Sequence, residues 1–275
     1  MKLGMFFSHI DTIVEQGDAE NISNALKKVV PRGIEYVDID GASIGINHNV
    51  EEIKSVLSDN GVKTGSLFYL ANFDWKNKNV LDVFKEQTKR QLEYCAYLGT
   101  DLFMPVPNIT VKQTSDYERI ECQKIVIEYF NQCALMSKEY NISTVVENFS
   151  EHANPYSKLE DFEVIFNNTS DVGYVLDTGN FWFSDVDYLD AYDKYHSITR
   201  HIHLKDIHPN KDGFFKINDR CADIGYIGGG VIDLKSLSQK LKKYNYNGIL
   251  SIEINNFENM LENVIKSIDF AKKLF

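Results

Sequence analysis

The sequence is short of cysteine, of basic residues and of long apolar runs. Its four cysteines, Cys95, Cys122, Cys133 and Cys221, show no CxxC spacing, which indicates reduced, mostly buried thiols of a cytoplasmic protein. Lys and Arg number 29 against 40 Asp and Glu, a formal net charge of -11, which argues against nucleic-acid and anionic-membrane partners. No apolar run is long enough to span a membrane, and polar residues follow the first apolar ones too soon for a signal peptide.

No linker, low-complexity stretch or block of like charge divides the 275 residues, and 43% of them are hydrophobic, enough to bury one large core. Strand-like and helix-like segments alternate from end to end. The strands are nearly continuous apolar runs, as parallel strands covered by helices should be. This pattern predicts an α/β fold with a single (β/α)8 TIM barrel over residues 1–275, rather than an open doubly wound sheet.

The expected elements follow one another in regular order. Strands are predicted at Lys2–Phe7, Glu35–Ile39, Val62–Leu70, Asp101–Val106, Ser143–Glu147, Val172–Asp177, Arg200–Leu204 and Ile249–Ile254. Helices are predicted at Asn21–Val30, Glu51–Asp59, Val80–Leu98, Asp116–Tyr140, Leu159–Asn167, Asp187–Tyr195, Leu234–Tyr244 and Phe257–Phe275. The last helix has the clearest period, with apolar residues at three- and four-residue steps.

Four consecutive strands carry a metal-binding residue type at or next to their carboxyl ends. These residues are Glu147, Asp177, His203 and Glu253. In a (β/α)8 barrel the carboxyl ends of the strands meet at one mouth, where the chemistry sits. Carboxylates brought together there would repel one another and would be costly to bury. A divalent cation removes that cost, and the histidine supplies a nitrogen ligand, so the sequence predicts a metal site.

Short motifs around these four residues resemble the xylose isomerase-like TIM barrels, the sugar phosphate isomerase/epimerase group. The matching pieces, in consistent order, are Gly33–Asp38, Val145–Asn148, Leu176–Asn180, His203–Asp206, Gly228–Asp233 and Ser251–Glu253. The resemblance implies that Glu147, Asp177, His203 and Glu253 bind one divalent ion. Manganese is the first expectation, and magnesium, cobalt and zinc are the alternatives.

The resemblance also implies a reaction and its acid–base groups. In the ketose 3-epimerase branch, two glutamates act on a small sugar or polyol. Carried over, Glu147 would take the proton from the carbon α to a carbonyl, and Glu253, on the opposite face, would return one. The ion would act as a Lewis acid that stabilises the enediolate. Neither nucleic acid nor membrane is an expected partner, and a homo-oligomer stays open.

Further substrate contacts are expected at four positions, namely Asn180, Lys205, His9 and Trp182. Asn180 stands where many members have a histidine, and it can donate a hydrogen bond but cannot take on charge. Lys205 points inward beyond His203, toward either a substrate oxygen or phosphate or a nearby carboxylate. His9 is expected at the end of the first strand. Trp182 suits the apolar face of a sugar, and loop packing is the alternative that its loop position favours.

Other polar residues are expected to support the site. His201 lies on the same face as His203, one layer deeper, and is predicted to be a hydrogen-bonded core histidine. Asp38 either supports the site or pairs with a lysine. Asp206 is expected to orient a neighbour or to cap a loop. The amides of Gly228–Gly230 either approach a phosphate or form a plain tight turn.

Three other functions remain open. The first is an inosose-type dehydratase, with the same proton abstraction followed by loss of a β-hydroxyl group. The second is a phosphodiesterase similar to endonuclease IV, which would need further histidines; the ends of strands three and four, Leu70–Asn72 and Met104–Pro107, carry none. The third is a non-catalytic sugar-binding barrel. Retention of all four ligands argues against it, because an uncompensated carboxylate cluster is costly.

Overall fold

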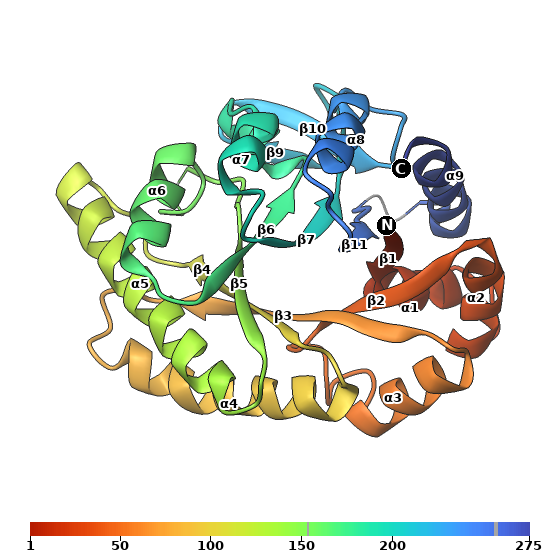
Figure 1. The fold of residues 1–275 in the computed structure, drawn as a ribbon, viewed down its shortest axis with the longest axis horizontal. Helices are drawn as coiled ribbons and strands as arrows, with labels where there is room; N and C mark the ends of the chain where they lie inside the picture. Colours follow the sequence, from red (N-terminus) through yellow and green to blue (C-terminus); the bar gives the residue numbers. More distant parts are fainter. Residues whose placement is uncertain (153, 256–257) are drawn as a thin grey trace.

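Parallel strands form a closed ring, and helices cover its outer side (Figure 1). The structure, a computed structural model, describes residues 1–152, 154–255 and 258–275. The barrel strands are β1 (Lys2–Phe6), β2 (Ile34–Asp40), β3 (Lys63–Phe73), β4 (Leu102–Ile109), β5 (Ser143–Glu147), β6 (Val172–Asp177), β7 (Thr199–Leu204) and β11 (Ile249–Ile252). They pair in the order β1-β11-β7-β6-β5-β4-β3-β2. This is the α/β, single (β/α)8 TIM barrel that the sequence predicts.

The helices follow the strands in chain order. They are α1 (Phe7–Glu15), α2 (Ile22–Val29), α3 (Val50–Asp59), α4 (Val80–Leu98), α5 (Asp116–Lys138), α6 (Leu159–Asn168), α7 (Tyr188–Tyr195), α8 (Leu234–Lys243) and α9 (Met260–Leu274), with short 3-10 turns η1 (Val30–Arg32) and η2 (Asn180–Ser184). Local signals set their limits. Asn49 and Glu52 form a capping box at the start of α3, and α4 ends at Gly99, which has a φ of 79°. Phe257, the first residue of the predicted last helix, lies outside the described residues.

The barrel strands alternate as predicted between the interior and the helical layer. Val145 and Val175 belong to an inner apolar cluster, whereas Val146 and Leu176 belong to the large core between the strands and the helices. A strand places successive side chains on opposite faces. Glu147 and Asp177, two residues after the inner valines, therefore also face the interior.

The register of the strands sets the heights of the candidate ligands. Asp177 on β6 pairs in register with His203 on β7, and Glu147 on β5 pairs two residues below Asp177. His203 pairs with Ser251 on β11, so Glu253 follows two residues higher. This stagger is a property of closed barrels. Glu147 thus lies one inward-facing position below Asp177 and His203, and Glu253 lies one such position above them. Because the two glutamates have the longer side chains, all four residues can reach a common point.

Three parts of the fold differ from the prediction. Helix α1 begins at Phe7, directly after β1, so His9 lies in a helix rather than at the end of a strand. The helix forms because Phe7, Ile10 and Ile13, three residues apart, make a buried stripe. Strands β3 and β4 also extend three residues beyond their predicted ends, to Phe73 and Ile109.

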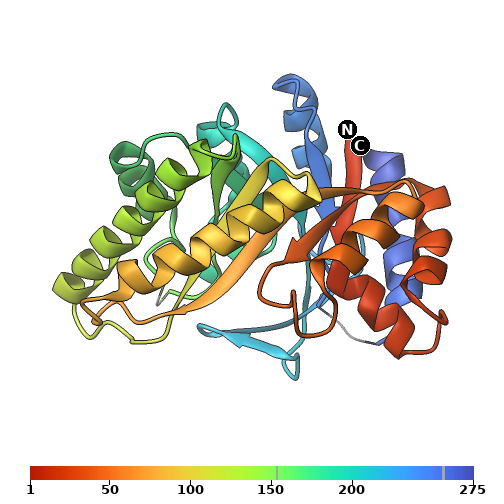
Figure 2. The same ribbon diagram turned by 90° about the horizontal axis from the view of Figure 1, so that it is seen from below.

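The third difference is a small antiparallel sheet that follows β7. It consists of β8 (Asp206–Pro209), β9 (Phe215–Ile217) and β10 (Arg220–Gly225), in the order β8-β10-β9. Ile207, Ala222 and Ile224 pack against Phe183 of η2, which anchors the sheet. The sheet projects from the end of the barrel away from the chain termini (Figure 2). It therefore flanks the end where the strands finish.

The cysteines are free thiols, as the sequence predicts. Cys95, Cys122 and Cys133 are buried, and Cys221 is partly exposed. Burial raises the pKa of Cys122 and of Cys133 to about 12. Within the described ranges, no helix combines the length and the apolar character that crossing a bilayer requires.

Candidate metal centre

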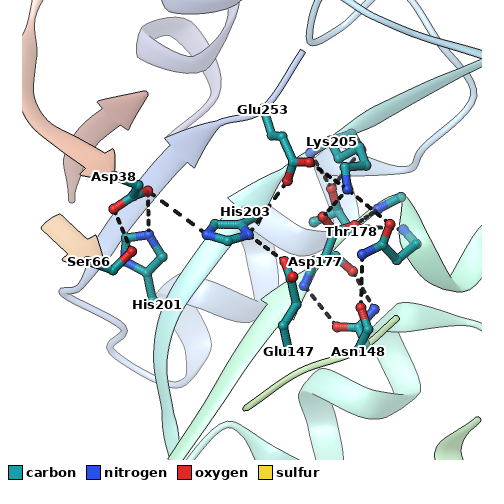
Figure 3. Close-up of polar contacts among 12 residues, drawn as sticks. Asp38, Ser66, Glu147, Asn148, Asp177, Thr178, His201, His203, Lys205 and Glu253 are labelled. Atoms are coloured by element: carbon teal, nitrogen blue, oxygen red, sulfur yellow. Dashed lines mark hydrogen bonds and ion pairs between the residues drawn. The ribbon is translucent and has the colours of Figure 1, made fainter. Parts of the chain in front are cut away.

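Four side chains converge at the carboxyl end of the barrel (Figure 3). Glu147, Asp177 and His203 come from β5, β6 and β7, and Glu253 follows β11. One potential ligand atom from each lies within 4.8 Å of all the others. Asp177 and His203 are buried, whereas Glu147 and Glu253 are partly exposed. The structure thus brings together the four residues that the sequence singles out, in an arrangement that fits one small cation.

The contacts of His203 indicate what kind of group fits between the carboxylates. Its Nδ1 atom contacts Oε1 of Glu147 and lies 3.6 Å from Oε2 of Glu253. Burial opposes protonation of this imidazole, yet the charges of Glu147 and Glu253 raise its pKa to about 9. Lone pairs on nitrogen and oxygen repel, so this contact requires either a proton or a metal cation between the two atoms. Three carboxylates and one imidazole suit a divalent ion such as manganese, zinc or magnesium.

The carboxylate of Asp177 is oriented by the backbone that follows β6. Its Oδ1 atom accepts hydrogen bonds from the amides of Gly179, at 2.8 Å, and Asn180, at 2.6 Å. Its Oδ2 atom lies 2.8 Å from Nζ of Lys205. The amides therefore fix the carboxylate plane and leave one oxygen toward the centre.

Lys205 places an ammonium group within the site. Its Nζ atom lies 2.8 Å from Oδ2 of Asp177 and 2.8 Å from Oε1 of Glu253, and it donates a 2.9 Å hydrogen bond to Oδ1 of Asn180. Burial disfavours its charge, but Asp177 and Glu253 raise its pKa above the ordinary value. The predicted pairing with a carboxylate is thus present. Burial also raises the pKa of Glu253, to about 7, although Lys205 acts in the opposite direction.

Asp38 and His201 lie on the other side of the His203 ring (Figure 3). Asp38 accepts a 2.8 Å hydrogen bond from Oγ of Ser66, and its Oδ2 atom lies 2.9 Å from Nε2 of His201. Burial would raise the pKa of Asp38, but His201 lowers it to about 2. The core role predicted for His201 is confirmed. Pairing of Asp38 with a lysine is wrong, because Asp38 pairs with His201 in the layer below the four candidate ligands.

Asp38 is also placed to orient His203. Its Oδ2 atom lies 3.9 Å from Nε2 of His203, which has no hydrogen-bond partner among the described residues. Asp38, His201 and His203 form a second group of potential ligand atoms. Ser66 and His201 already contact the carboxylate of Asp38, and His203 belongs to both groups. We therefore interpret this second group as support for the four-residue centre.

Asn148 is a supporting residue whose role the sequence did not reveal. It is buried, and its Nδ2 atom donates to the carbonyl oxygen of Asp177 at 3.0 Å. Its Oδ1 atom accepts from the amide of Asp177 and from the hydroxyl of Tyr174, both at 2.9 Å. Asn148 thus fixes the end of β6 through both the amide and the carbonyl group of Asp177. An asparagine directly after a strand-end glutamate was the available signal.

Asn180, predicted to contact substrate, is held by protein groups. Its Oδ1 atom accepts from Lys205 and from Oγ of Ser150, each at 2.9 Å. Its Nδ2 atom donates to the carbonyl oxygen of Asn148 at 2.9 Å. These contacts connect Asn180 to the centre through Lys205. A direct substrate contact stays a prediction.

His9 and Trp182 contact protein groups, and their substrate contacts also stay predictions. Nε2 of His9 lies 2.9 Å from the carbonyl oxygen of Ile254, and burial lowers the pKa of His9 to about 4. The ring of Trp182 packs edge-on against Phe183, with the guanidinium of Arg220 4.6 Å from the ring centre. These contacts agree with the loop-packing interpretation of Trp182.

The carboxylate of Asp206 closes the glycine loop after the small sheet. It accepts hydrogen bonds from the amides of Gly228 at 2.8 Å, Gly230 at 2.9 Å and Ile232 at 3.2 Å. The prediction that Asp206 caps a loop is therefore confirmed. The phosphate interpretation of this loop is wrong for Gly228 and Gly230, because their amides are already engaged.

Comparison with known proteins identifies the family and the fold of the chain. The family described as xylose isomerase-like TIM barrel matches residues 28–274. An inosose dehydratase from Histophilus somni (strain 129Pt) is 29% identical over 117 residues, which are 38% of this chain and only 39% of that relative. A crystal structure of the IOLI protein with a binding zinc atom has a TM-score of 0.76 at 19% identity, covering 100% of this chain and 99% of that chain.

A further solved structure is the D-allulose 3-epimerase from Methylomonas sp. in complex with D-allulose. Its TM-score is 0.77 at 15% identity, with coverage of 100% of this chain and 97% of that chain. At such identities the structural likenesses establish the fold alone.

Proposed function

The chain belongs to the xylose isomerase-like TIM barrel family, and from this membership we propose that it is a divalent-metal-dependent isomerase or epimerase of a small sugar or polyol. The observation that carries the proposal is the convergence of Glu147, Asp177, His203 and Glu253, with one ligand atom from each within 4.8 Å of the others. In this proposal all four bind the ion, with manganese as the first to test. The ion would supply Lewis-acid stabilisation of negative charge on the substrate oxygens.

The two glutamates are proposed to move the protons. Glu147 and Glu253 are the partly exposed members of the centre, and both have a carboxylate oxygen near Nδ1 of His203. They come from β5 and from the end of β11, with β6 and β7 between them in the barrel. Glu147 takes the proton α to the carbonyl, and Glu253 returns one from the opposite face. Inversion at carbon requires two such groups on opposite sides of the substrate.

Lys205 favours a second candidate function on the same site. Loss of a β-hydroxyl group after proton abstraction needs a donor to the departing oxygen, and the ammonium of Lys205 lies 2.8 Å from Oε1 of Glu253. A dehydratase acting on a cyclic polyol ketone would use this donor. The partial likeness to an inosose dehydratase supports including that substrate class in the test.

The test begins with metal analysis of purified protein, followed by a panel of ketoses, ketose phosphates and inososes with and without manganese. In deuterated water, NMR should find deuterium at an α-carbon of the product of either reaction. An epimerase or isomerase product keeps all the hydroxyl groups of the substrate, whereas a dehydratase product has lost one. Absence of deuterium from all substrates, with no bound metal, would refute both. Cleavage of an abasic-site oligonucleotide, or sugar binding without turnover, would support the two remaining alternatives.

Variants of the two glutamates sharpen that test. Glu147→Gln and Glu253→Gln should each reduce turnover by at least about a hundredfold, the lower range for loss of a general acid or base. Circular dichroism should show an intact fold. Glu93→Gln, on the exposed side of α4, is the matched control and should keep the wild-type rate. Wild-type turnover in either site variant would contradict the acid–base assignment.

A further inference from the structure

Lys205 is rigidly mounted beside the candidate metal ligands. Its backbone amide donates to Oγ1 of Thr178 at 2.9 Å, and that hydroxyl donates to the Lys205 carbonyl oxygen at 2.8 Å. Its stem packs so closely on Gly179 that a Cβ atom there would lie 2.8 Å from Cγ of Lys205. The side chain is only 6% exposed. The fold therefore holds the ammonium group of Lys205 in one buried position.

That ammonium contacts the carboxylates that would hold the ion. Nζ lies 2.8 Å from Oδ2 of Asp177 and 2.8 Å from Oε1 of Glu253. With Glu147 these make three negative charges. The ammonium of Lys205 compensates one of these negative charges. The two that remain are matched by the charge of one divalent ion. Lysine and ion together would therefore neutralise the carboxylates.

We propose that Lys205 is a permanent counter-cation of the metal centre, which holds Asp177 and Glu253 together before an ion binds and weakens the binding of that ion. The inference rests on the metal site proposed above and not on which reaction it catalyses. Its physical basis is like-charge repulsion between an ammonium and a divalent cation that share ligands in a weakly solvated site. The consequence is a centre that exists without metal and exchanges its metal readily.

Removing the charge should have two effects of opposite sign. Without a divalent ion, the three carboxylates of the Lys205→Met variant would have no ammonium beside them, so the variant should unfold at a lower temperature than the wild type. With an ion, three carboxylates that no longer share an ammonium should attract it more strongly than before. A lysine that only packs, or that only orients its neighbours, predicts weaker metal binding in the variant.

The experiment measures the binding of manganese and of zinc to chelator-treated protein by calorimetry, and the unfolding temperature with and without each ion. For Lys205→Met we expect at least tenfold tighter binding, a lower metal-free unfolding temperature and a larger shift on adding metal. Lys240→Met is the matched control, because Lys240, on α8, forms its ion pair with Asp193, on α7, and not with a carboxylate of the candidate centre. Its metal affinity should equal that of the wild type.

The outcomes separate this inference from the proposed function. Wild-type protein that binds neither ion would overturn both. Wild-type binding with unchanged or weaker binding in Lys205→Met would overturn only the counter-cation role. Should Lys205→Met fail to fold, the double variant Lys205→Met/Glu253→Gln removes one charge of each sign. Its recovery as a folded protein would support the inference, and its failure to fold would assign Lys205 to packing and overturn it.

Discussion

Replacing Asp38 by asparagine tests whether the layer below the four candidate ligands controls the proposed metal centre. The side chain is fully buried, and its carboxylate lies 2.8 Å from Oγ of Ser66, 2.9 Å from Nε2 of His201 and 3.9 Å from Nε2 of His203. Asparagine has nearly the same shape but carries no charge. The change therefore removes the negative charge that faces two imidazoles while leaving the packing of the barrel interior intact.

The size of the effect follows from these contacts. A hydrogen bond to a charged group contributes about 1 kcal/mol more than a neutral one, so two close bonds predict a loss of about 2 kcal/mol in the free energy of unfolding. Orientation of His203 is a separate effect. If Nδ1 binds the ion, Nε2 carries the proton, and Asp38 is the carboxylate beside it. Loss of a hydrogen-bonded carboxylate partner weakens metal binding by roughly 10- to 100-fold. Because Oδ2 of Asp38 lies 3.9 Å from Nε2 of His203, we expect the lower end of this range, about tenfold or about 1.4 kcal/mol.

Calorimetric titration of chelator-treated Asp38→Asn with zinc and manganese measures the second effect, and urea unfolding measures the first. Asp40→Asn is the control, since Asp40 lies on the same strand and accepts a 2.9 Å hydrogen bond from the amide of Ala42. It should bind metal as the wild type does. A folded Asp38→Asn protein with metal affinity within about twofold of the wild type would refute the orienting role, because about tenfold is the smallest effect expected of such a partner.

Three further predictions concern packing, thiols and acid stability. Gly179→Ala should lower the free energy of unfolding in urea by about 1–3 kcal/mol, because the added methyl group overlaps the stem of Lys205; unchanged stability would contradict that close approach. A thiol reagent should modify Cys221 readily in native protein and the three buried cysteines only after denaturation. Hydrogen bonds from Lys76 and Thr114 lower the pKa of Glu118 from 4.5 to about 2, so its stabilising effect is complete above pH 4.5 and is lost toward pH 2. Glu118→Gln should flatten that part of the acid-unfolding curve, and an unaltered curve would show that the pairing is immaterial.

The strands that carry the candidate ligands were predictable because two strong patterns coincide in them. Buried parallel strands are continuous apolar runs, and a charged residue at the end of such a run stands out. Chain order then places consecutive strand ends side by side in a closed barrel, without any knowledge of side-chain contacts. The positions of Glu147 and Asp177 follow from this reasoning alone. Their convergence with His203 needs only the inward alternation that the structure has.

The elements that were missed have weaker or conflicting patterns. Helix α1 follows β1 without a turn, and its first residue, Phe7, is apolar like the strand before it. Strand β9 has only three residues, Phe215–Ile217, and gains its stability from pairing with β10 rather than from its own sequence. Short segments of this kind depend on tertiary context.

The supporting residues were harder to predict than the ligands, because their roles depend on distances between residues far apart in the chain. Lys205 had two equally good sequence interpretations, and only its 2.8 Å approach to Asp177 and Glu253 identifies the pairing. Asn148 was visible as part of a motif, but its bonds to both peptide groups of Asp177 were not. A single sequence gives residue types and faces, whereas these roles are set by angles and distances.

The two glutamates differ in a way that bears on the choice between epimerase and dehydratase. Glu253 has Lys205 beside one of its oxygens, whereas Glu147 has His203 as its close neighbour. An epimerase needs two proton-transfer groups on opposite faces, so both Glu147→Gln and Glu253→Gln should abolish product. A dehydratase needs one base and one donor to the departing hydroxyl group, so Lys205→Met should then reduce turnover as severely as the loss of the base. Because both glutamates are proposed metal ligands in either reaction, the turnover of Lys205→Met is the result that separates the two reactions, even before the products are identified.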